Sequence, residues 1–544
     1  MALTSSMRMR PGRVLLPVLG LVLAGAAGAA DWPQWGGRDE RNFVSDEKGI
    51  PESFAPAVRE NKEKGIAASP ARNVKWVARL GSQTYGNPSV SGGKVFLGTN
   101  DASFNDPRLK KSGGGLVMCL DEATGSVLWQ LPVPRIRTKD GNFNFDHLSL
   151  GICSSPSVDG DRVYLVTNRC EVLCLDADGQ ADGNDGPFQD EGRYMVGPGE
   201  LPTKPGRFAE KDWPAPPPPV TVGPGDGDIV WRFDMLKDLD VWPQDASDCS
   251  VLVYGDCLYV CTSNGVDLSH SRIPSPKTPD LICLDKKTGR LVAGNDPPLG
   301  DAIFHGEWSS PCLARLKDRA LVLFGGGDGF CYGFDPAPAP GADGGPGSLK
   351  SMWKFDCNPP HNKVKDGKPL AYNKNAAGPS EIIGTPVFCG GRVYVTVGQD
   401  SRHGNGPGCL SCIDPTKSGD ATETGKVWQY HDLQRSFSTP SVVGDLVFVV
   451  DYAGIVHCVD AATGKAHWKH DLGAHVWGST FAVDGKVFVG DEAGKLTVFA
   501  CDRQERVLAT MKFDVPVYAT PIAAGGVLYV TTQTHLYAVA ADTP

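Results

Sequence analysis

Cys409 and Cys412 are separated by two residues, a spacing typical of redox sites and of zinc knuckles. The pair falls in an expected strand, and no second pair stands at metal-binding spacing. Ile413 follows where a covalent haem motif needs His. The pattern therefore favours a structural role for both thiols, with a redox or metal site as the alternative.

An acidic run from Asp176 to Gly186 offers the clustered oxygen ligands that calcium prefers. Counted from Asp178, the twelfth position of a calcium-binding loop needs Glu but holds Gln189. A solvated acidic loop is the interpretation that this departure favours over a calcium site.

Three residues have side chains suited to acid-base chemistry and stand beside tryptophans. His305 and Glu307 lie just before Trp308, and His475 lies two residues before Trp477. General acid-base catalysis needs a hydrogen-bonded partner at short range, and the sequence indicates no such partner.

These candidates are distributed over copies of one repeat. Each copy begins with a small polar or Gly residue, often followed by Pro, and then a Val. A turn with Gly and a run of β-branched and aromatic residues come next. The last three copies start 41 and 40 residues apart, a length that suits four short strands. Eight copies begin at Pro88, Pro156, Val251, Pro311, Pro386, Pro440, Phe481 and Pro521.

The second half of the repeat has a turn signature. A third run ends in Asp121, Thr124 and Gly125 form the turn, and a fourth run ends in Trp129. Asp and Thr can accept turn amides, Gly adopts positive φ, and the Trp can pack between neighbouring sheets. The signature recurs from Asp460 to Trp468, and from Asp285 to Gly289 without the Trp. Four strands in each copy predict one blade of a β-propeller.

The small residue, Asp, Thr-Gly and Trp at this spacing resemble the PQQ-like (pyrroloquinoline quinone) β-propeller repeat over about residues 73 to 540. The resemblance implies an all-β, eight-bladed propeller, and it extends to quinoprotein alcohol dehydrogenases and to outer-membrane assembly propellers. It also implies that cysteines at the small-residue position of the third strand are packing residues. These are Cys119, Cys174, Cys283, Cys412 and Cys458.

The ends of the chain suggest how the ring closes. The last copy supplies three strands, whereas Val74 to Val77 is an unassigned strand upstream of the first copy. We expect it to complete the last blade, because closure removes an exposed sheet edge. The predicted organisation is a signal peptide at 1–29, an extension at 31–72, and the propeller at 73–544 with an insertion at 177–227. The insertion, with its Pro-rich run, should extend toward the face opposite the longer loops.

In a propeller, the loops after second and fourth strands open on one face, and most of the extra length falls there, at 101–115, 131–150, 266–280, 356–381 and 399–408. Two rings of side chains are candidates for a ligand-binding mouth on that face, with ordinary turn chemistry and inter-blade packing as the alternatives. Polar residues follow the second strands at Asn100, Asn168, Asn264, Asp328, Asp400, Asp451, Asp491 and Gln533. Aromatic residues precede the innermost strands at Tyr85, Trp308, Phe437, Trp477 and Tyr518.

The first thirty residues indicate export. Three Arg precede an apolar run of about 14 residues that ends in small residues, a pattern typical of a secretory signal peptide. No later stretch reaches the roughly 20 apolar residues of a membrane helix, and no Cys follows the run as a lipid anchor would need. With a formal net charge of -10, nucleic acid is a poor partner. We expect a periplasmic or secreted protein, and a monomer.

Three classes of function remain open. The first is a non-catalytic binding or scaffold module for a protein, peptide or glycan. The second is a dehydrogenase that uses PQQ and calcium, and the third is a hydrolytic or lyase activity. The resemblance implies a vicinal Cys pair in many quinoprotein alcohol dehydrogenases, but no two Cys are adjacent here and haem attachment is absent. The sequence therefore favours the binding module.

Overall fold

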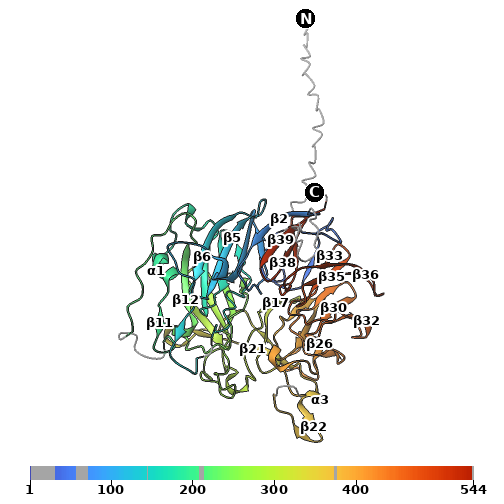
Figure 1. Ribbon diagram of the computed structural model, residues 1–544. Helices are drawn as coiled ribbons and strands as arrows, with labels where there is room; N and C mark the ends of the chain where they lie inside the picture. Colours follow the sequence, from blue (N-terminus) through green and yellow to red (C-terminus); the bar gives the residue numbers. More distant parts are fainter. Residues whose placement is uncertain (2–30, 57–70, 144, 207–212, 373–376, 542–544) are drawn as a thin grey trace.

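The structure is a computed structural model that describes residue 1 and residues 31–56, 71–143, 145–206, 213–372 and 377–541 (Figure 1). The predicted signal peptide lies outside the described residues apart from Met1. Eight four-stranded antiparallel sheets form an eight-bladed propeller, which confirms the predicted fold class.

The first four blades follow the chain from residue 89 to residue 356. Blade 1 contains β3 (Ser89–Ser91), β4 (Lys94–Asn100), β5 (Gly115–Asp121) and β6 (Val127–Val133); blade 2 contains β8 (Ser157–Asp159), β9 (Arg162–Val166), β10 (Glu171–Asp176) and β12 (Ile229–Asp234); blade 3 contains β13 (Leu252–Tyr254), β14 (Cys257–Cys261), β15 (Leu281–Asp285) and β16 (Leu291–Asn295); blade 4 contains β17 (Cys312–Arg315), β18 (Ala320–Gly325), β19 (Phe330–Phe334) and β21 (Ser351–Asp356).

The remaining blades complete the ring. Blade 5 contains β24 (Val387–Cys389), β25 (Arg392–Val397), β26 (Cys409–Ile413) and β28 (Lys426–Tyr430); blade 6 contains β29 (Ser441–Val443), β30 (Leu446–Val450), β31 (Ile455–Asp460) and β32 (Ala466–Asp471); blade 7 contains β33 (Phe481–Val483), β34 (Lys486–Gly490), β35 (Lys495–Ala500) and β36 (Val507–Lys512); blade 8 contains β37 (Ile522–Ala524), β38 (Val527–Thr531), β39 (His535–Val539) and β2 (Val74–Arg79).

Short elements decorate the blades. Parallel strands β1 (Val44–Ser45), β20 (Gly347–Leu349) and β27 (Gly419–Asp420) join the edges of blades 7, 3 and 4; β22 (Val364–Lys365) and β23 (Lys368–Pro369) form a hairpin; and the helices are α1 (Glu191–Val196), α2 (Met235–Asp238) and α3 (Pro360–Lys363).

Strand β2 closes the ring. It pairs antiparallel with β39, which joins residues near the two ends of the described chain (Figure 1). Its residues alternate between buried and exposed, as expected for an outer strand that covers the sheet with one face. The prediction that an N-terminal strand completes the last blade is confirmed.

The turn signature works as predicted. Asp121 accepts hydrogen bonds from the amide and hydroxyl of Thr124, at 2.8 and 2.7 Å, and Gly125 has a φ of 71°. A Cβ on Gly125 would collide with the ring of Trp76, which belongs to the preceding blade. The Trp therefore packs on the turn of the next blade, and only Gly leaves room for it. Gly179, Gly289 and Gly464 meet Trp129, Trp231 and Trp428 in the same way.

Cysteines occupy the space under these tryptophans. Cys119 stands opposite Phe96 on one neighbouring strand and Trp129 on the other, and Cys458 stands between Phe448 and Trp468. All sixteen cysteines have free thiols in the described structure. A small apolar side chain between two rings is consistent with a packing role.

A ring of hydrogen bonds links the inner ends of the blades. In seven of the eight blade-to-blade links, the amide of the small polar residue at the start of a copy donates to the side-chain oxygen of its counterpart in the next blade, at 2.7 to 3.1 Å. The participants are Asn87, Ser155, Ser250, Ser310, Thr385, Thr439, Ser479 and Thr520. The small polar residue of the repeat thus serves inter-blade bonding.

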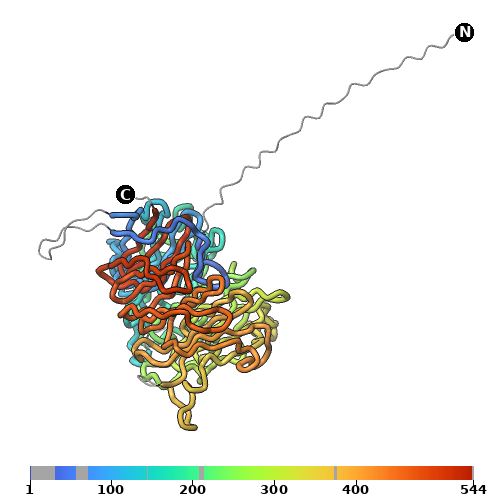
Figure 2. The backbone as a smooth tube through the Cα atoms, turned by 90° about the vertical axis from the view of Figure 1, so that its right-hand side faces the viewer, coloured from blue at the N-terminus to red at the C-terminus, as the bar shows by residue number. Residues whose placement is uncertain are grey.

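The N-terminal extension passes along the inside of this ring, and Figure 2 shows the N-terminal segment crossing the C-terminal blades. Its backbone bonds to one inner strand after another: Trp32 pairs with Val90, Asp39 O accepts from Leu313, and Phe43 O accepts from Ala482. The fully buried Arg41 donates to Pro311 O and Val251 O, both at 2.9 Å. The extension therefore fills one end of the central channel.

The insertion follows the third strand of blade 2, but it does not stay on the face opposite the longer loops. Its strand β11 (Glu200–Leu201) pairs in parallel with β7 (Arg137–Thr138), which belongs to a long loop of the other face. Helix α1 buries Tyr194 and Met195, and this apolar pair explains why the segment folds back along the propeller instead of extending into solvent.

Candidate functional site

A cavity of about 320 Å³ lies at the centre of the ring, below the long loops. All five predicted mouth aromatics line it, namely Tyr85, Trp308, Phe437, Trp477 and Tyr518. Trp35 of the extension also lines it and bonds to Thr385, which precedes the inner strand β24. Because the extension occupies the other end of the channel, the cavity is blind.

Four of the aromatic residues form a continuous wall. Tyr85 and Tyr518 stack with ring centroids 4.8 Å apart. Trp477 contacts both, with centroids at 6.0 and 5.8 Å, and Phe437 lies 5.7 Å from Trp477. Contacts at these distances stabilise the rings against one another along the side of the cavity that they line.

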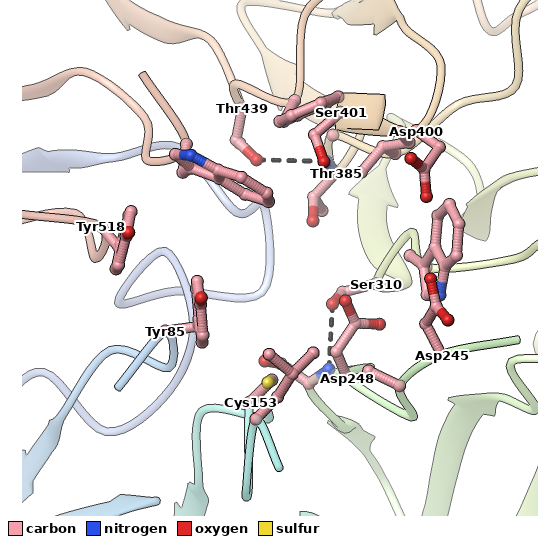
Figure 3. A pocket seen from close by; sticks show the side chains of 18 of the residues that line it. Tyr85, Cys153, Asp245, Asp248, Ser310, Thr385, Asp400, Ser401, Thr439 and Tyr518 are labelled. Atoms are coloured by element: carbon pink, nitrogen blue, oxygen red, sulfur yellow. Dashed lines mark hydrogen bonds between the residues drawn. The ribbon is translucent and has the colours of Figure 1, made fainter. Parts of the chain in front are cut away.

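Acidic residues lie across the cavity from Tyr85 and Tyr518 (Figure 3). Asp245 and Asp400 both pair with Arg402. Burial alone would raise the pKa of Asp400, but hydrogen bonds and charge from Arg402 hold it below its ordinary value. Burial raises the pKa of Asp245, against the opposing effect of Arg402.

Asp248 is the third acidic residue of the cavity, and it differs from the other two. Its Oδ1 atom is buried and has no hydrogen-bond partner among the described residues. Burial raises the pKa of its carboxyl group well above the ordinary value. A carboxyl group without a cation nearby leaves the cavity with an unsatisfied acceptor.

The predicted ring of polar residues is placed in two ways. Asp400 lines the cavity, whereas the other seven hydrogen-bond to the turn or strand that follows them or to the loops between blades. Asn100, for example, accepts from Ser82 N at 2.8 Å and donates to Ser149 O at 3.0 Å. The seven are Asn100, Asn168, Asn264, Asp328, Asp451, Asp491 and Gln533.

His305 and Glu307 are buried, and neither lines the cavity. The Nε2 of His305 lies 2.8 Å from Nδ1 of His270, and burial holds the pKa of His305 well below its ordinary value. Burial and the neighbouring Asp280 raise the pKa of Glu307. A neutral imidazole is therefore expected for His305 near neutral pH.

His475 lies outside the cavity wall. Its ring stacks on Tyr452 at 4.4 Å, and its Nδ1 lies 3.4 Å from Glu492. Both His475 and Glu492 line a second, open hollow. Tyr452 also contacts Trp477 edge to face, so the ring of Tyr452 lies between His475 and the wall of the cavity.

The acidic run forms a cluster away from the cavity. Oxygens of Asp176, Asp178 and Asp182 lie within 4.8 Å of one another, the one such group of three or more potential metal ligands among the described residues. Lys94 pairs with Asp178 at 2.7 Å, and Arg162 pairs with Asp176. These cations already balance part of the cluster's charge.

The cavity does not fit PQQ. That cofactor has three carboxylate groups, and Arg402 is the single Lys or Arg among the described lining residues. Asp245 and Asp400 already hold Arg402, and Asp248 adds a third acid. No trio of metal ligands among the described residues lies at this cavity to bring a calcium ion. A trianion would face repulsion here without compensation.

Sequence reasoning missed Trp35, Asp245, Asp248 and Arg402. Arg402 lies in one of the long loops, at 399–408, so loop length was an available signal. Asp245 and Asp248 precede a copy that lacks the usual Pro. Trp35 lies in the extension, outside any repeat, and no pattern in the sequence places it.

Comparisons with known proteins agree with the repeat. A family model for the outer membrane protein assembly factor BamB matches residues 363–470, 417–509 and 452–543. No curated protein sequence matches the chain.

Similar solved structures include BamB from Moraxella catarrhalis, with a TM-score of 0.48 and 14% identity over 86% of this chain and 97% of that one. A quinohemoprotein alcohol dehydrogenase from Comamonas testosteroni gives 0.45 and 16% over 96% and 82%, and a europium-containing methanol dehydrogenase gives 0.46 and 13% over 94% and 98%. Similarities of this size carry no argument about function. The ring of eight blades, the Asp, Thr-Gly and Trp turns and the family-model match identify the chain as a PQQ-like β-propeller repeat protein.

Proposed function

We propose that the chain is a non-catalytic binding module that takes a side chain or end of a partner molecule into the central cavity. One observation carries this proposal: a blind cavity with a continuous aromatic wall opens under the long loops. Aromatic side chains give large contact area with little loss of conformational entropy, which suits recognition.

A protein or peptide is the partner that the comparisons favour, with a glycan as the alternative. The matched family model is named for an outer membrane protein assembly factor. Exposed apolar side chains accompany the long loops, since Leu148 lines the cavity and Leu268 is half exposed in a loop of the same face. Such residues offer a partner apolar contacts around the cavity.

The quinone dehydrogenase is the weaker candidate because the charges of the cavity oppose its cofactor. Proton transfer has little support either, since His305 and Glu307 are buried away from the cavity and His475 lies beyond Tyr452. The site thus has surfaces for recognition, and the three residues predicted for acid-base chemistry do not line it.

Selection of linear peptides from a displayed library on the immobilised protein tests the binding module. We expect peptides with micromolar affinity whose binding is lost in Trp477→Ala and retained in Leu268→Ala. Both variants should first be shown to melt like the parent. Peptides that bind Trp477→Ala as well as the parent would contradict a role for the cavity.

We further propose that the protein is exported. Among the described residues, no helix is long and apolar enough to cross a membrane. The sequence pattern of the first thirty residues supports removal of a leader near Ala29. N-terminal sequencing of secreted or periplasmic protein should begin near Ala30 or Asp31, and exported protein that retains Met1 would overturn this proposal.

A further inference from the structure

We propose that the central cavity binds an ammonium-type cation, held between the aromatic wall and the carboxylate of Asp248. This inference rests on the proposed binding function and names the chemistry of the group that enters. The cation can belong to a free quaternary ammonium compound or to a lysine side chain of a partner, and the experiment below separates the two.

The charges of the cavity point to a cation. Asp245, Asp248 and Asp400 line it, and Arg402 is the one Lys or Arg among the described lining residues. Arg402 pairs with Asp245 and Asp400. The ionised cavity therefore has an excess of negative charge, which would attract a cation and repel an anion.

Asp248 is the group that a cation would satisfy. Its Oδ1 is buried without a hydrogen-bond partner among the described residues. Leaving a buried acceptor without a hydrogen-bond partner is unfavourable. An entering N–H donor or cationic group would supply the missing partner. Figure 3 shows Asp248 near the middle of the cavity, beside Ser310 and across from Tyr85.

The aromatic wall has the geometry that a cation prefers. Tyr85 and Tyr518 stack at 4.8 Å, and Trp477 meets Tyr518 edge to face at an interplanar angle of 76°. Rings at different orientations around one space allow more than one π-face to meet a single cation, as in aromatic cages for methylated ammonium ions. A cavity of about 320 Å³ has room for a group of that size.

A neutral sugar is a poorer occupant of this particular cavity. A sugar stacks on aromatic rings too, but it does not need the carboxyl group of Asp248, and the other two acids are committed to Arg402. The unpaired carboxyl group thus discriminates between the two chemistries.

The carboxyl group of Asp248 also predicts a pH dependence. Burial raises its pKa, so at low pH the group is neutral and attracts a cation weakly. Affinity should therefore rise as pH increases through the pKa of Asp248, with release of a proton on binding.

The other titratable groups that line the cavity are less suited than Asp248 to cause this pH dependence. Arg402 holds Asp400 ionised and also pairs with Asp245, whose pKa burial raises. Burial raises the pKa of the Tyr85 and Tyr518 hydroxyls and of the Cys153 thiol, so these three groups stay neutral across the range from pH 5 to pH 8.

Titration calorimetry with choline and with its neutral isostere 3,3-dimethylbutan-1-ol tests the inference. We expect choline to bind at least tenfold more tightly than the alcohol at pH 8, and the difference to shrink at pH 5. Enthalpies in buffers of different ionisation heat should show proton release for choline alone. Nα-acetyl-lysine methylamide, with its Nε-acetylated analogue as the neutral control, provides the lysine arm.

Asp248→Asn is the decisive variant, because it keeps the shape of the side chain and removes the charge. Choline affinity should fall about tenfold, proton release should disappear, and affinity for the alcohol should stay unchanged. Asp256→Asn removes an exposed carboxylate from the turn between β13 and β14 and serves as the matched control, with no expected change.

The outcomes distinguish this inference from the proposed function. Equal affinity for choline and the alcohol, or equal losses for both in Asp248→Asn, would overturn the cation inference. If peptides selected by display depend on Trp477 but show no enrichment of lysine or other cations, and choline binds no more tightly than the alcohol, the binding module stands and the cation inference fails. If no selected peptide depends on Trp477, the binding module itself fails.

Discussion

Trp35 donates a hydrogen bond from its indole Nε1 to Oγ1 of Thr385, 3.0 Å away, although 350 residues separate them in the sequence. Thr385 stands at the blade-to-blade link that differs from the other seven, since the amide of Ser310 makes no bond to it among the described contacts. The side chain of Trp35 thus has two roles: it gives Thr385 a hydrogen-bond partner at that link, and it forms the floor of the cavity.

Substitution of Trp35 should separate these two roles. Trp35→Phe keeps a ring as the floor and loses the hydrogen bond, and should lower the free energy of unfolding by about 1 kcal/mol. Trp35→Ala should cost about 2–3 kcal/mol, because it also removes packing from a half-buried site. Urea unfolding measures both, and an unchanged midpoint in Trp35→Ala would contradict the role of the extension.

Arg41 should be the most sensitive residue of the extension. Its guanidinium donates to backbone oxygens of Pro311, Val251 and Trp35, and it is fully buried. Arg41→Leu leaves these acceptors unsatisfied and should destabilise the fold by about 3 kcal/mol or more. The exposed Arg38 offers a matched control, since Arg38→Leu should change stability by less than about 0.5 kcal/mol. Comparable losses in the two variants would refute this account.

Two deletions compare the N-terminus with the insertion. Truncation of the exported protein through Val77 removes most of β2 and the whole extension, so it exposes the edge of blade 8 and opens the channel. Removal of residues 214–219, the Pro-rich run, takes away a surface segment and should cost much less. Thermal unfolding should show a large drop for the first deletion only, and equal drops would contradict closure by β2.

Addition of PQQ and calcium should leave the melting temperature unchanged. A cofactor at a thousandfold excess over its dissociation constant would stabilise the protein by roughly 4 kcal/mol. We expect no such effect, and no dye-linked oxidation of alcohols or sugars, because the acids of the cavity oppose a tricarboxylate. A shift that requires both calcium and quinone, and that Trp308→Ala abolishes, would instead establish the dehydrogenase.

Glu381 should make stability depend on pH. Burial raises its pKa to about 8, and Tyr372 donates to its Oε1 at 3.1 Å. Between the ordinary pKa of Glu and about 8, the unfolded chain has lost the proton that the folded protein retains. Stability should therefore fall as pH rises through this window, by up to about 1.4 kcal/mol for each pH unit. Glu381→Gln should flatten this part of the profile, measured by urea unfolding from pH 5 to pH 8.5, and an identical slope in the variant would exclude Glu381 as its source.

The sequence by itself determined the blades, because each one is specified by residues that are close together in the chain. Asp121, Thr124 and Gly125 make their turn within five residues, and the strands on either side, β5 and β6, pair as a hairpin. The sequence also placed β2 in the last blade, although the pairing is not local, because a closed ring leaves one position for a strand that carries Trp76.

Only the tertiary structure decided which side chains share the cavity. The five predicted aromatics converge there because each precedes an inner strand, and the ring brings all inner strands to one axis. The polar residues after the second strands were also predicted to surround the mouth, but Asn100 and others, such as Asn168 and Asn264, bond to loops or strand ends of a neighbouring blade-to-blade connection instead. The positions of the unpaired acid Asp248 and of Trp35 at the cavity floor depend on how the loops and the extension pass through the ring. Contacts between residues hundreds of positions apart set these paths, and short-range sequence patterns do not predict them.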